Sequence, residues 1–539
     1  MAGPIVAAGG DGAAAGAQDK VWPSASAAYW ALAVIVLATF MSFLDQIVFG
    51  MLAENIKRDF SLTDTQLGFL AGPATIICYF FVGIPLGRLA DSWKRVRLMS
   101  VGLGLWSLMT ALSGFARNGT MLTGARIGVG VGEATASPAA YSLISDLFPR
   151  HMRATALAIY SSGLYLGGGL SLLIGGVIVQ RWNQAYPLGG PLGLVGWQAA
   201  FMAVGLPGLV LALWVSTLRE PVRGAIDGLP TPSDPQPFRG FASELLDVIP
   251  PLTLLGASRR GTSALVANLA VAGGISLAVW GLTALLGRST LQQWSFVGVG
   301  VYAVYCWASA LRARDLPTFR LIWGSPAFLC TTLGYGMVAF SSYAASYWGA
   351  PYAERTFQIA KADLGWLIGA PAAVAGFLGV IAGGWLADRL QRRTENGRVL
   401  VVLIGLVTPV LPLVWAYRTD SFASFAVLSF LAVMCASSAL GAAAAASQAL
   451  VLPRMRGTAT ATFFLATTLV GLALGPFMAG YVSARNGDDL SLGVLSTLVS
   501  VPIGTVLLIA ALRLVPAAAT SVAARAEAAG ERLDPVQER

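Results

Sequence analysis

Apolar segments of about 20 residues recur along the whole chain, and no other feature limits its possible folds as strongly. A helix of that length crosses the hydrocarbon core of a bilayer. Only 11% of the 539 residues are charged, so the chain cannot cover a surface that faces water, since soluble domains carry about 25%. Within lipid every backbone amide needs an internal hydrogen-bond partner, which favours helices. The sequence therefore predicts an all-α, polytopic membrane protein surrounded by the lipid bilayer.

Fourteen transmembrane helices are predicted, in the order six, two and six. Their approximate ranges are 28–52, 66–90, 96–116, 119–148, 153–180, 194–218, 263–287, 292–312, 320–348, 364–389, 397–417, 421–449, 457–484 and 489–514. The predicted organisation is a disordered cytoplasmic leader at 1–27, a six-helix half at 28–218, a proline-rich cytoplasmic linker at 219–262, two extra transmembrane helices at 263–312, a second six-helix half at 313–514 and a cytoplasmic tail at 515–539.

Basic residues gather in the short loops on one side of the predicted helices. They are Lys94, Arg95, Arg97, Arg150, Arg153, Arg392, Arg393, Arg398, Arg454 and Arg456. An excess of Lys and Arg marks the cytoplasmic side, and an even number of spans places both termini there. We expect a multi-pass protein of the cell membrane, in a bacterium the inner membrane. The net charge of +9 is divided among these loops, so no nucleic-acid partner is predicted.

The sequence offers no pattern for a metal, a cofactor or a catalytic site. His151 is the only histidine, and the four cysteines lie scattered in apolar segments without a CxxC pair. No Walker A motif is present, and no nucleophile–base constellation can be assembled from the intramembrane residues. We therefore predict neither cofactor nor metal and expect a protein that is not an enzyme.

An internal repeat links the two halves. The pattern Leu-Gly-x-Leu-x-Gly occurs at 67–72 and 364–369, and Gly-x-Leu-Ala-Asp occurs at 87–91 and 384–388, both at an offset of 297 residues. Two matched patterns at one offset indicate parallel halves. Such halves place a substrate site near the middle of the membrane, between them.

The first Gly-x-Leu-Ala-Asp copy, with Lys94, Arg95 and Arg97 after it, resembles the loop motif of the major facilitator superfamily, although that motif usually has glycine at Lys94. The first 220 residues further resemble the Spinster branch. The matching features are Asp45, the run 62–68, the stretch 85–91, Arg126 to Glu133, and the Ser-Pro-Ala-Ala-Tyr run at 137–141. Spinster proteins usually carry arginine directly after the first aspartate, where this chain has Gln46. The resemblance implies a major facilitator fold and a transporter of lysophospholipids or sphingoid lipids.

The repeated motif predicts a conformational gate. Asp91 lies at a helix end, where its carboxylate could face the positive N-terminus of the helix that begins near Gly457. Asp388 could do the same for the helix that begins near Arg153. The gating set is Gly87, Asp91, Arg95, Arg97, Gly384 and Asp388. The alternative is that these are ordinary charged residues of interfacial loops.

Three charges lie deep inside predicted helices: Asp45, Arg126 and Glu133. A charge there costs about 2.5–3.5 kcal/mol on insertion scales, which makes each a functional candidate. Arg126 and Glu133 are two helical turns apart and share a face. Burial favours the protonated acid and a nearby arginine favours the ionised one, so the three residues could couple transport to protons. The resemblance implies the same roles. A static ion network is the alternative.

The first helix of the second half carries aromatic residues instead of charges. They are Tyr335, Phe340, Tyr343 and Tyr347. With Arg126 opposite, they suggest a cavity for an amphiphile, although aromatic residues in such helices also serve in packing. The leading hypothesis is a monomeric, proton-coupled secondary transporter of an amphiphilic solute that works by alternating access. The alternatives are a drug or small-metabolite carrier, a membrane-embedded lipid enzyme and a non-transporting scaffold.

Overall fold

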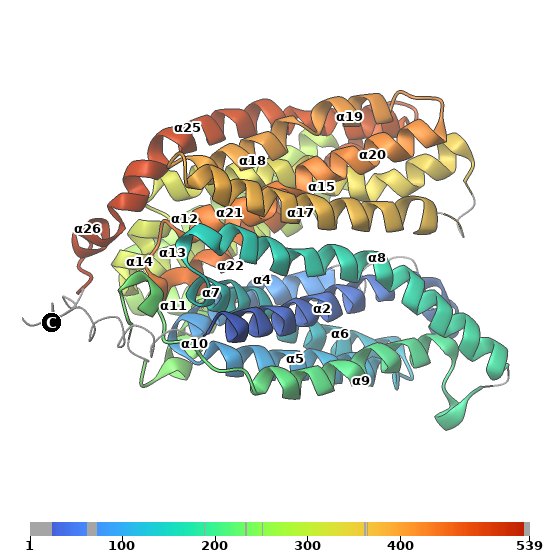
Figure 1. The fold of residues 1–539 in the computed structure, drawn as a ribbon, viewed down its shortest axis with the longest axis horizontal. Helices are drawn as coiled ribbons and strands as arrows, with labels where there is room; N and C mark the ends of the chain where they lie inside the picture. Colours follow the sequence, from blue (N-terminus) through green and yellow to red (C-terminus); the bar gives the residue numbers. More distant parts are fainter. Residues whose placement is uncertain are drawn as a thin grey trace, which may run out of the picture.

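Two bundles of helices lie side by side along their length in a computed structural model of the protein (Figure 1). The structure describes residues 24–61, 73–187, 189–231, 234–250, 252–359, 363 and 365–532. Every regular element in these ranges is helical. Most of the predicted leader and the first copy of the Leu-Gly-x-Leu-x-Gly pattern lie outside the described residues, as do the run at 62–68 and the last seven residues of the predicted tail.

The first bundle contains seven helices that correspond to the six predicted spans. They are α2 (Ala25–Phe60), α4 (Pro73–Ser92), α5 (Arg95–Ser113), α6 (Gly119–Glu133), α7 (Ala136–Leu147), α8 (Arg153–Ala185) and α9 (Gly196–Ser216). The fourth predicted span is interrupted at Ala134 and Thr135 and forms both α6 and α7. α8 packs so closely along α2 that a Cβ added at Gly167 would lie only 2.4 Å from the carbonyl oxygen of Phe40.

Between the halves lie five helices, and the segment 219–262 contains more helix than predicted. The elements are α10 (Pro237–Val248), α11 (Leu252–Arg260), α12 (Thr262–Leu286), α13 (Leu291–Arg314) and α14 (Leu316–Ile322). α10 and α11 lie inside the predicted proline-rich linker and meet at an angle of 106°. α12 and α13 occupy the range of the two predicted extra helices. α10 packs on α4, so the linker contacts the first bundle directly.

The second bundle repeats the arrangement of the first. Its elements are α15 (Pro326–Phe357), η5 (Gly365–Gly369), α17 (Ala370–Gln391), α18 (Gly397–Val407), α19 (Val410–Ala416), α20 (Phe422–Ser437), α21 (Ala439–Gln448), α22 (Arg456–Ala466), η7 (Thr467–Ala473), α23 (Gly475–Arg485), α24 (Leu490–Ser496), α25 (Ser500–Thr520) and α26 (Val522–Glu527). η5 and η7 are π-helical, a form that in other proteins is frequent at functional sites.

Each of the fourteen predicted ranges contains helix. Eleven helices of the described residues are long and apolar enough to cross a membrane, or up to thirteen if each of two bent pairs is one span. The chain is therefore an all-α polytopic membrane protein, and the count of fourteen stays a prediction. The ranges 66–90 and 119–148 are not among these helices, the latter because α6 and α7 have only 15 and 12 residues, and one bent pair, α10 with α11, lies in the predicted linker.

The two bundles meet at the end of the molecule that carries the basic loops, which we call the basic end. There α22 packs against α4 and α7, and α17 and α21 pack against α8. One continuous cluster of buried apolar residues crosses this junction, and the Tyr141 ring lies 5.3 Å from that of Phe464. In Figure 1 the basic end is on the left, with α26. The structure is thus closed at the basic end.

Candidate functional site

The three predicted intramembrane charges come together inside the first bundle. Asp45 lies on α2, and Arg126 and Glu133 lie on α6. An Nη of Arg126 is 3.3 Å from Oδ1 of Asp45, and the Thr110 hydroxyl donates to Oδ2 of Asp45 at 2.6 Å. The exposed fractions of Asp45, Arg126 and Glu133 are 1%, 3% and 2%. A buried ion pair of this kind needs good geometry to offset its desolvation, and Thr110 completes it.

Glu133 is held by neutral donors and not by the arginine. Ser42 donates its hydroxyl to Oε1 of Glu133 at 3.2 Å, and Gln46 donates its amide to Oε2 at 2.9 Å. Ser42 and Gln46 lie three residues before and one after Asp45, on the face of α2 that meets α6. Gln46 is the residue that departs from the Spinster pattern, so the departure lies in direct contact with Glu133.

This arrangement supplies one cation for two carboxylic acids. Arg126 pairs with Asp45 and stacks over the Phe49 ring at 5.1 Å, while its Nε has no partner within the described residues. With both acids ionised the buried cluster carries one excess negative charge, and a single proton neutralises it. Burying an uncompensated charge is costly, so a cluster of this composition can take up and release one proton. Ser42 and Thr110, absent from the predicted set, complete its hydrogen bonds.

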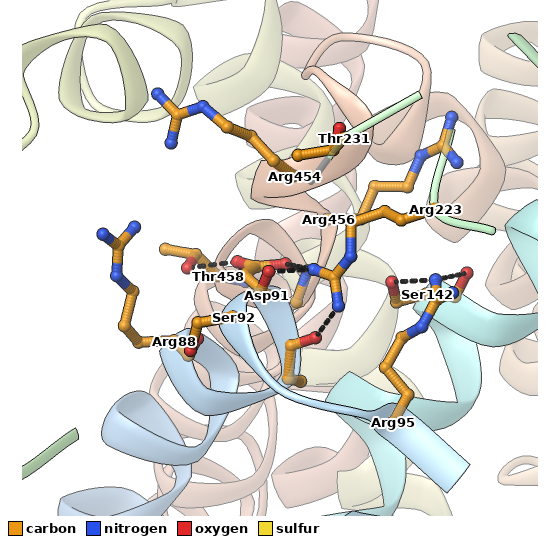
Figure 2. Close-up of polar contacts among 12 residues, drawn as sticks. Arg88, Asp91, Ser92, Arg95, Ser142, Arg223, Thr231, Arg454, Arg456 and Thr458 are labelled. Carbon is orange, nitrogen blue, oxygen red and sulfur yellow. Dashed lines mark hydrogen bonds and ion pairs between the residues drawn. The ribbon is translucent and has the colours of Figure 1, made fainter. Parts of the chain in front are cut away.

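At the basic end, the first copy of the motif caps a helix of the opposite half. α22 has no capping side chain of its own. Asp91 accepts the backbone N–H groups of Gly457 at 2.6 Å and Thr458 at 2.7 Å, and the Thr458 hydroxyl at 2.6 Å. Figure 2 shows Asp91 beside Thr458. The carboxylate thus fills amide donors that a helix N-terminus leaves unpaired, in the favourable field of the helix dipole.

The second copy makes the same contacts with the halves exchanged. α8 also lacks a capping side chain of its own. Asp388 accepts the N–H groups of Ala154 at 3.2 Å and Thr155 at 2.8 Å, and the Thr155 hydroxyl at 2.9 Å. An Nη of Arg398 lies 3.4 Å from Oδ1 of Asp388. Each half therefore caps one helix of the other.

The motif glycines allow the backbones to approach at these caps. A Cβ at Gly87 would lie 2.9 Å from the Ala461 Cβ, and a Cβ at Gly384 would lie 2.3 Å from the Ala158 Cβ. Distances this short force a shift of the helices. Gly87 and Gly384 therefore set the helix spacing that brings Asp91 and Asp388 within reach of the N–H groups.

The two predicted gating arginines behave differently. Arg95 is fully buried and contacts Asp146, Glu220 at 2.8 Å and the Ser142 hydroxyl at 3.1 Å. Figure 2 shows it against Ser142. Arg97 is exposed and has no ion pair among the described residues, so its inclusion in the gating set is not supported by this geometry. The physical reason is that residues two positions apart on a helix point about 200° apart, so Arg95 and Arg97 face nearly opposite directions.

Residues of the linker, absent from the predicted gating set, also join the halves. Asp227 contacts Arg150 at 2.7 Å and Arg153 at 2.9 Å in the first half, and Arg456 in the second. These guanidinium groups hold the pKa of the Asp227 carboxyl well below its usual range. Nearby Arg223 donates to the backbone oxygens of Ala90 and Asp91. Sequence reasoning missed Asp227 because a loop has no periodicity to indicate which way its side chains point.

Asp315 forms a second bridge at the other end of the linker region. It contacts Arg88 of the first motif copy at 3.0 Å and Arg454 of the second half at 2.9 Å. It also caps α14 through the Thr318 N–H at 3.1 Å. Its hydrogen bonds and its pair of arginines lower the pKa of the Asp315 carboxyl. The extra helix pair, which ends at Arg314, is thereby tied to the gate.

The four predicted aromatic residues divide into a buried pair and a more exposed pair. Tyr335 and Phe340 are buried, and the Tyr335 ring stacks on Phe463 at 5.1 Å. Tyr343 and Tyr347 are 37% and 65% exposed. Within the described residues the structure shows no contact between these rings and Arg126, which is enclosed in the first bundle. The described part of the chain contains no cluster of three or more metal-ligating side chains.

Comparison with known proteins agrees with this two-bundle architecture. The family model described as Major Facilitator Superfamily matches residues 35–352 and 331–537, which together span most of the chain. The chain belongs to the Major Facilitator Superfamily. Among its relatives in the superfamily is an "MFS-type efflux pump" of Mycolicibacterium smegmatis, 27% identical over 91% of both chains. Another is "Protein spinster homolog 1" of Xenopus laevis, 23% identical over 84% of this chain and 72% of that protein.

Solved structures show the same fold. A bacterial homologue of the human lysosomal transporter Spinster, in an inward-facing unoccupied conformation, is 24% identical with a TM-score of 0.53, over 95% of this chain and all of that one. The proton:xylose symporter XylE is 14% identical with a TM-score of 0.61, over 92% and 97%. The protein is therefore a multi-pass transporter of the Major Facilitator Superfamily related to Spinster, as the sequence motifs predicted.

Proposed function

We propose that the protein is a proton-coupled secondary active transporter that carries an amphiphilic solute of the lysolipid or sphingoid type by alternating access. In this proposal it acts as a monomer in the cell membrane, the inner membrane of a bacterium. The basic end and both termini face the cytoplasm. The structure then represents an outward-facing state, since its cytoplasmic end is closed.

The proposal rests on the composition of the buried cluster, in which two carboxylic acids lie beside a single arginine. Arg126 pairs with Asp45, and neutral donors hold Glu133. Such a cluster is balanced with one proton, which we assign to Glu133 in this state. Protonation of Asp45 would release Arg126, which could then pair with the anionic head of a substrate. Loss of a proton would return Arg126 to Asp45 and expel the head group.

The aromatic residues of α15 supply the apolar side of the proposed substrate site. Tyr343 and Tyr347 are the exposed members, and they lie one helical turn apart on one face. A hydrocarbon tail gains free energy by contact with such rings. The Spinster relatives support a lipid class, since one of them is "Sphingosine-1-phosphate transporter SPNS2" of Danio rerio, 27% identical over 36% of this chain.

The test is transport of a labelled lysophospholipid in proteoliposomes, with and without a pH gradient. Wild type is compared with Asp45→Asn, Glu133→Gln and the control Glu395→Gln, which changes an exposed acid of a basic loop. We expect gradient-driven transport in wild type and control, and a loss of at least about 10-fold in the two cluster variants. Full gradient-driven transport by both cluster variants would contradict the coupling role.

A second candidate is efflux of drug-like compounds, favoured by the name and 91% coverage of the mycobacterial relative. The same vesicles distinguish it when they are loaded with ethidium instead of a lysophospholipid. Transport of ethidium without transport of the lysolipid would establish this alternative.

A further inference from the structure

A cavity of about 400 Å³ lies at the basic end between the two halves, and no residue of the buried acid cluster lines it. Its volume falls in the range of small-molecule sites. Arg150 and Arg153 line it from the first half, and Arg392, Arg398 and Arg456 line it from the second. Asp227 is its one lining carboxylate within the described residues. The proposed transport mechanism uses none of its interior space.

Positive charge exceeds negative charge around this cavity. Three carboxylates pair with four of the five arginines: Asp227 with Arg150, Arg153 and Arg456, Asp388 with Arg398, and Asp146 with Arg456. Asp146 is also shared with Arg95, which lies outside the cavity. Arg392 is exposed and makes no ion pair in the described part of the chain. A group with two negative charges would balance this set.

Donor groups inside the cavity wall also lack partners. Arg398 and Arg456 are only 7% and 2% exposed, yet the Nε of each has no hydrogen-bond partner among the described residues. A buried N–H without an acceptor costs about 1–3 kcal/mol, so such groups in a polar cavity indicate a missing acceptor. Planar guanidinium groups donate pairs of parallel hydrogen bonds that match phosphate oxygens.

We propose that this cavity binds a phosphate group and that the bound phosphate holds the basic end closed. Its arginines come from both halves, so a phosphate that contacts all of them binds the closed state more tightly than any state in which the halves separate. Binding therefore shifts the equilibrium towards closure. The remaining wall combines apolar residues such as Leu229, Val451 and Val522 with the polar residues His151, Gln391, Gln448 and Thr520. Either a free phosphate or the head group of an acidic phospholipid supplies the required chemistry.

Phosphate binding can be measured in two arms. In detergent, calorimetry follows inorganic phosphate, with chloride at equal ionic strength as the reference. In nanodiscs, the Tm is compared between phosphatidylcholine alone and phosphatidylcholine with phosphatidic acid. We expect saturable binding of phosphate or a rise in Tm of about 2 °C or more with phosphatidic acid. The first result identifies free phosphate as sufficient, and the second identifies a lipid head group.

Two variants and a control make the test decisive. Arg398→Gln removes a donor of the wall and is expected to weaken binding about 10-fold. Arg392→Gln changes an exposed residue without an ion pair and should therefore preserve the fold. It tests the cavity even if Arg398→Gln fails to fold. Arg393→Gln, exposed and outside the cavity wall, should bind as wild type does. Absence of binding in both arms, or equal binding by wild type and both cavity variants, would overturn the proposal.

Discussion

The two copies of the Gly-x-Leu-Ala-Asp motif form the same cap in different electrostatic surroundings. Asp91 and Asp388 each accept two helix N–H groups and one threonine hydroxyl from the opposite half. Around Asp91, the linker residues Glu220 and Arg223 pair with the motif and neutralise it. Around Asp388, the arginines outnumber the acids, and a cavity remains between them.

The difference shows what a local motif determines and what the rest of the chain adds. Five residues are sufficient to place a carboxylate at a helix N-terminus, because the required geometry is local to two packed helices. The linker supplies Glu220 and Arg223 to the first copy, and its Asp227 reaches the arginines beside the second copy. Beside the second copy the arginines still outnumber the carboxylates, and we infer that an external phosphate supplies the remaining negative charge.

The largest expected effect comes from Arg95, which is buried in the neutralised network. Arg95→Ala removes the arginine that pairs with Glu220 and one of the two that pair with Asp146, so we expect a loss of about 3 kcal/mol in the free energy of unfolding. Arg97→Ala, two residues away on the exposed face, should change it by less than about 0.5 kcal/mol. Thermal unfolding in detergent measures both. Equal effects would show that the ion network does not stabilise the first copy.

The caps themselves should differ in their contribution to closure. Asp91→Asn loses the carboxylate charge next to Arg223 as well as part of the cap, and we expect it to destabilise the closed end by about 2–3 kcal/mol. Asp388→Asn should destabilise it by about 1–2 kcal/mol, because the hydrogen bonds of Asp388 to the helix N–H groups, 3.2 and 2.8 Å, are longer than those of Asp91. Accessibility of a cysteine placed at Ala461 or Ala158 to a water-soluble reagent follows the opening. A larger opening for Asp388→Asn would reverse the assigned order.

The glycines test the packing beneath each cap. A Cβ at Gly384 would approach Ala158 more closely than one at Gly87 approaches Ala461. We expect Gly384→Ala to cost about 2 kcal/mol and Gly87→Ala about 1 kcal/mol. The Tm of the two variants gives this comparison directly. Identical values would mean that the helices relax equally at both copies.

The smallest expected effect is the response of the linker bridges to pH. The pKa values of Asp227 and Asp315 are lowered, so their stabilisation is fully present above the ordinary carboxyl pKa of about 4. It is lost only as the pH falls through the lowered folded values. Between pH 5 and 8 the bridges should contribute no change in Tm. Any change of Tm with pH in this window should therefore disappear in the double variant Asp45→Asn/Glu133→Gln. A change that persists in the double variant would come from the gate.

Sequence predicted the helices and the symmetric contacts well because both depend on regular patterns. Apolar runs identified the spans, the 297-residue offset identified the paired caps, and the two-turn spacing of Arg126 and Glu133 placed them on one face. Helical period also explains why Arg95 and not Arg97 is buried, once the start of α5 is known. The bridges through Asp227 and Asp315, and the helices α10 and α11, were not predicted. Loop side chains follow no period, and short helices of mixed polarity next to prolines resemble loops.

In the proposed mechanism the buried cluster and the paired caps are coupled, so that protonation of the cluster opens the basic end. Spin labels at Arg97 and Arg393, exposed on opposite halves of the basic end, report its width by pulsed electron spin resonance. Each variant and the labelled parent are measured at pH 5 and pH 8. We predict a short distance at pH 8 and a longer, partly populated distance at pH 5, with the pH dependence lost in Asp45→Asn and Glu133→Gln. A distance that is unchanged by pH in the parent, or that still responds in both variants, would show that the cluster does not control the basic end.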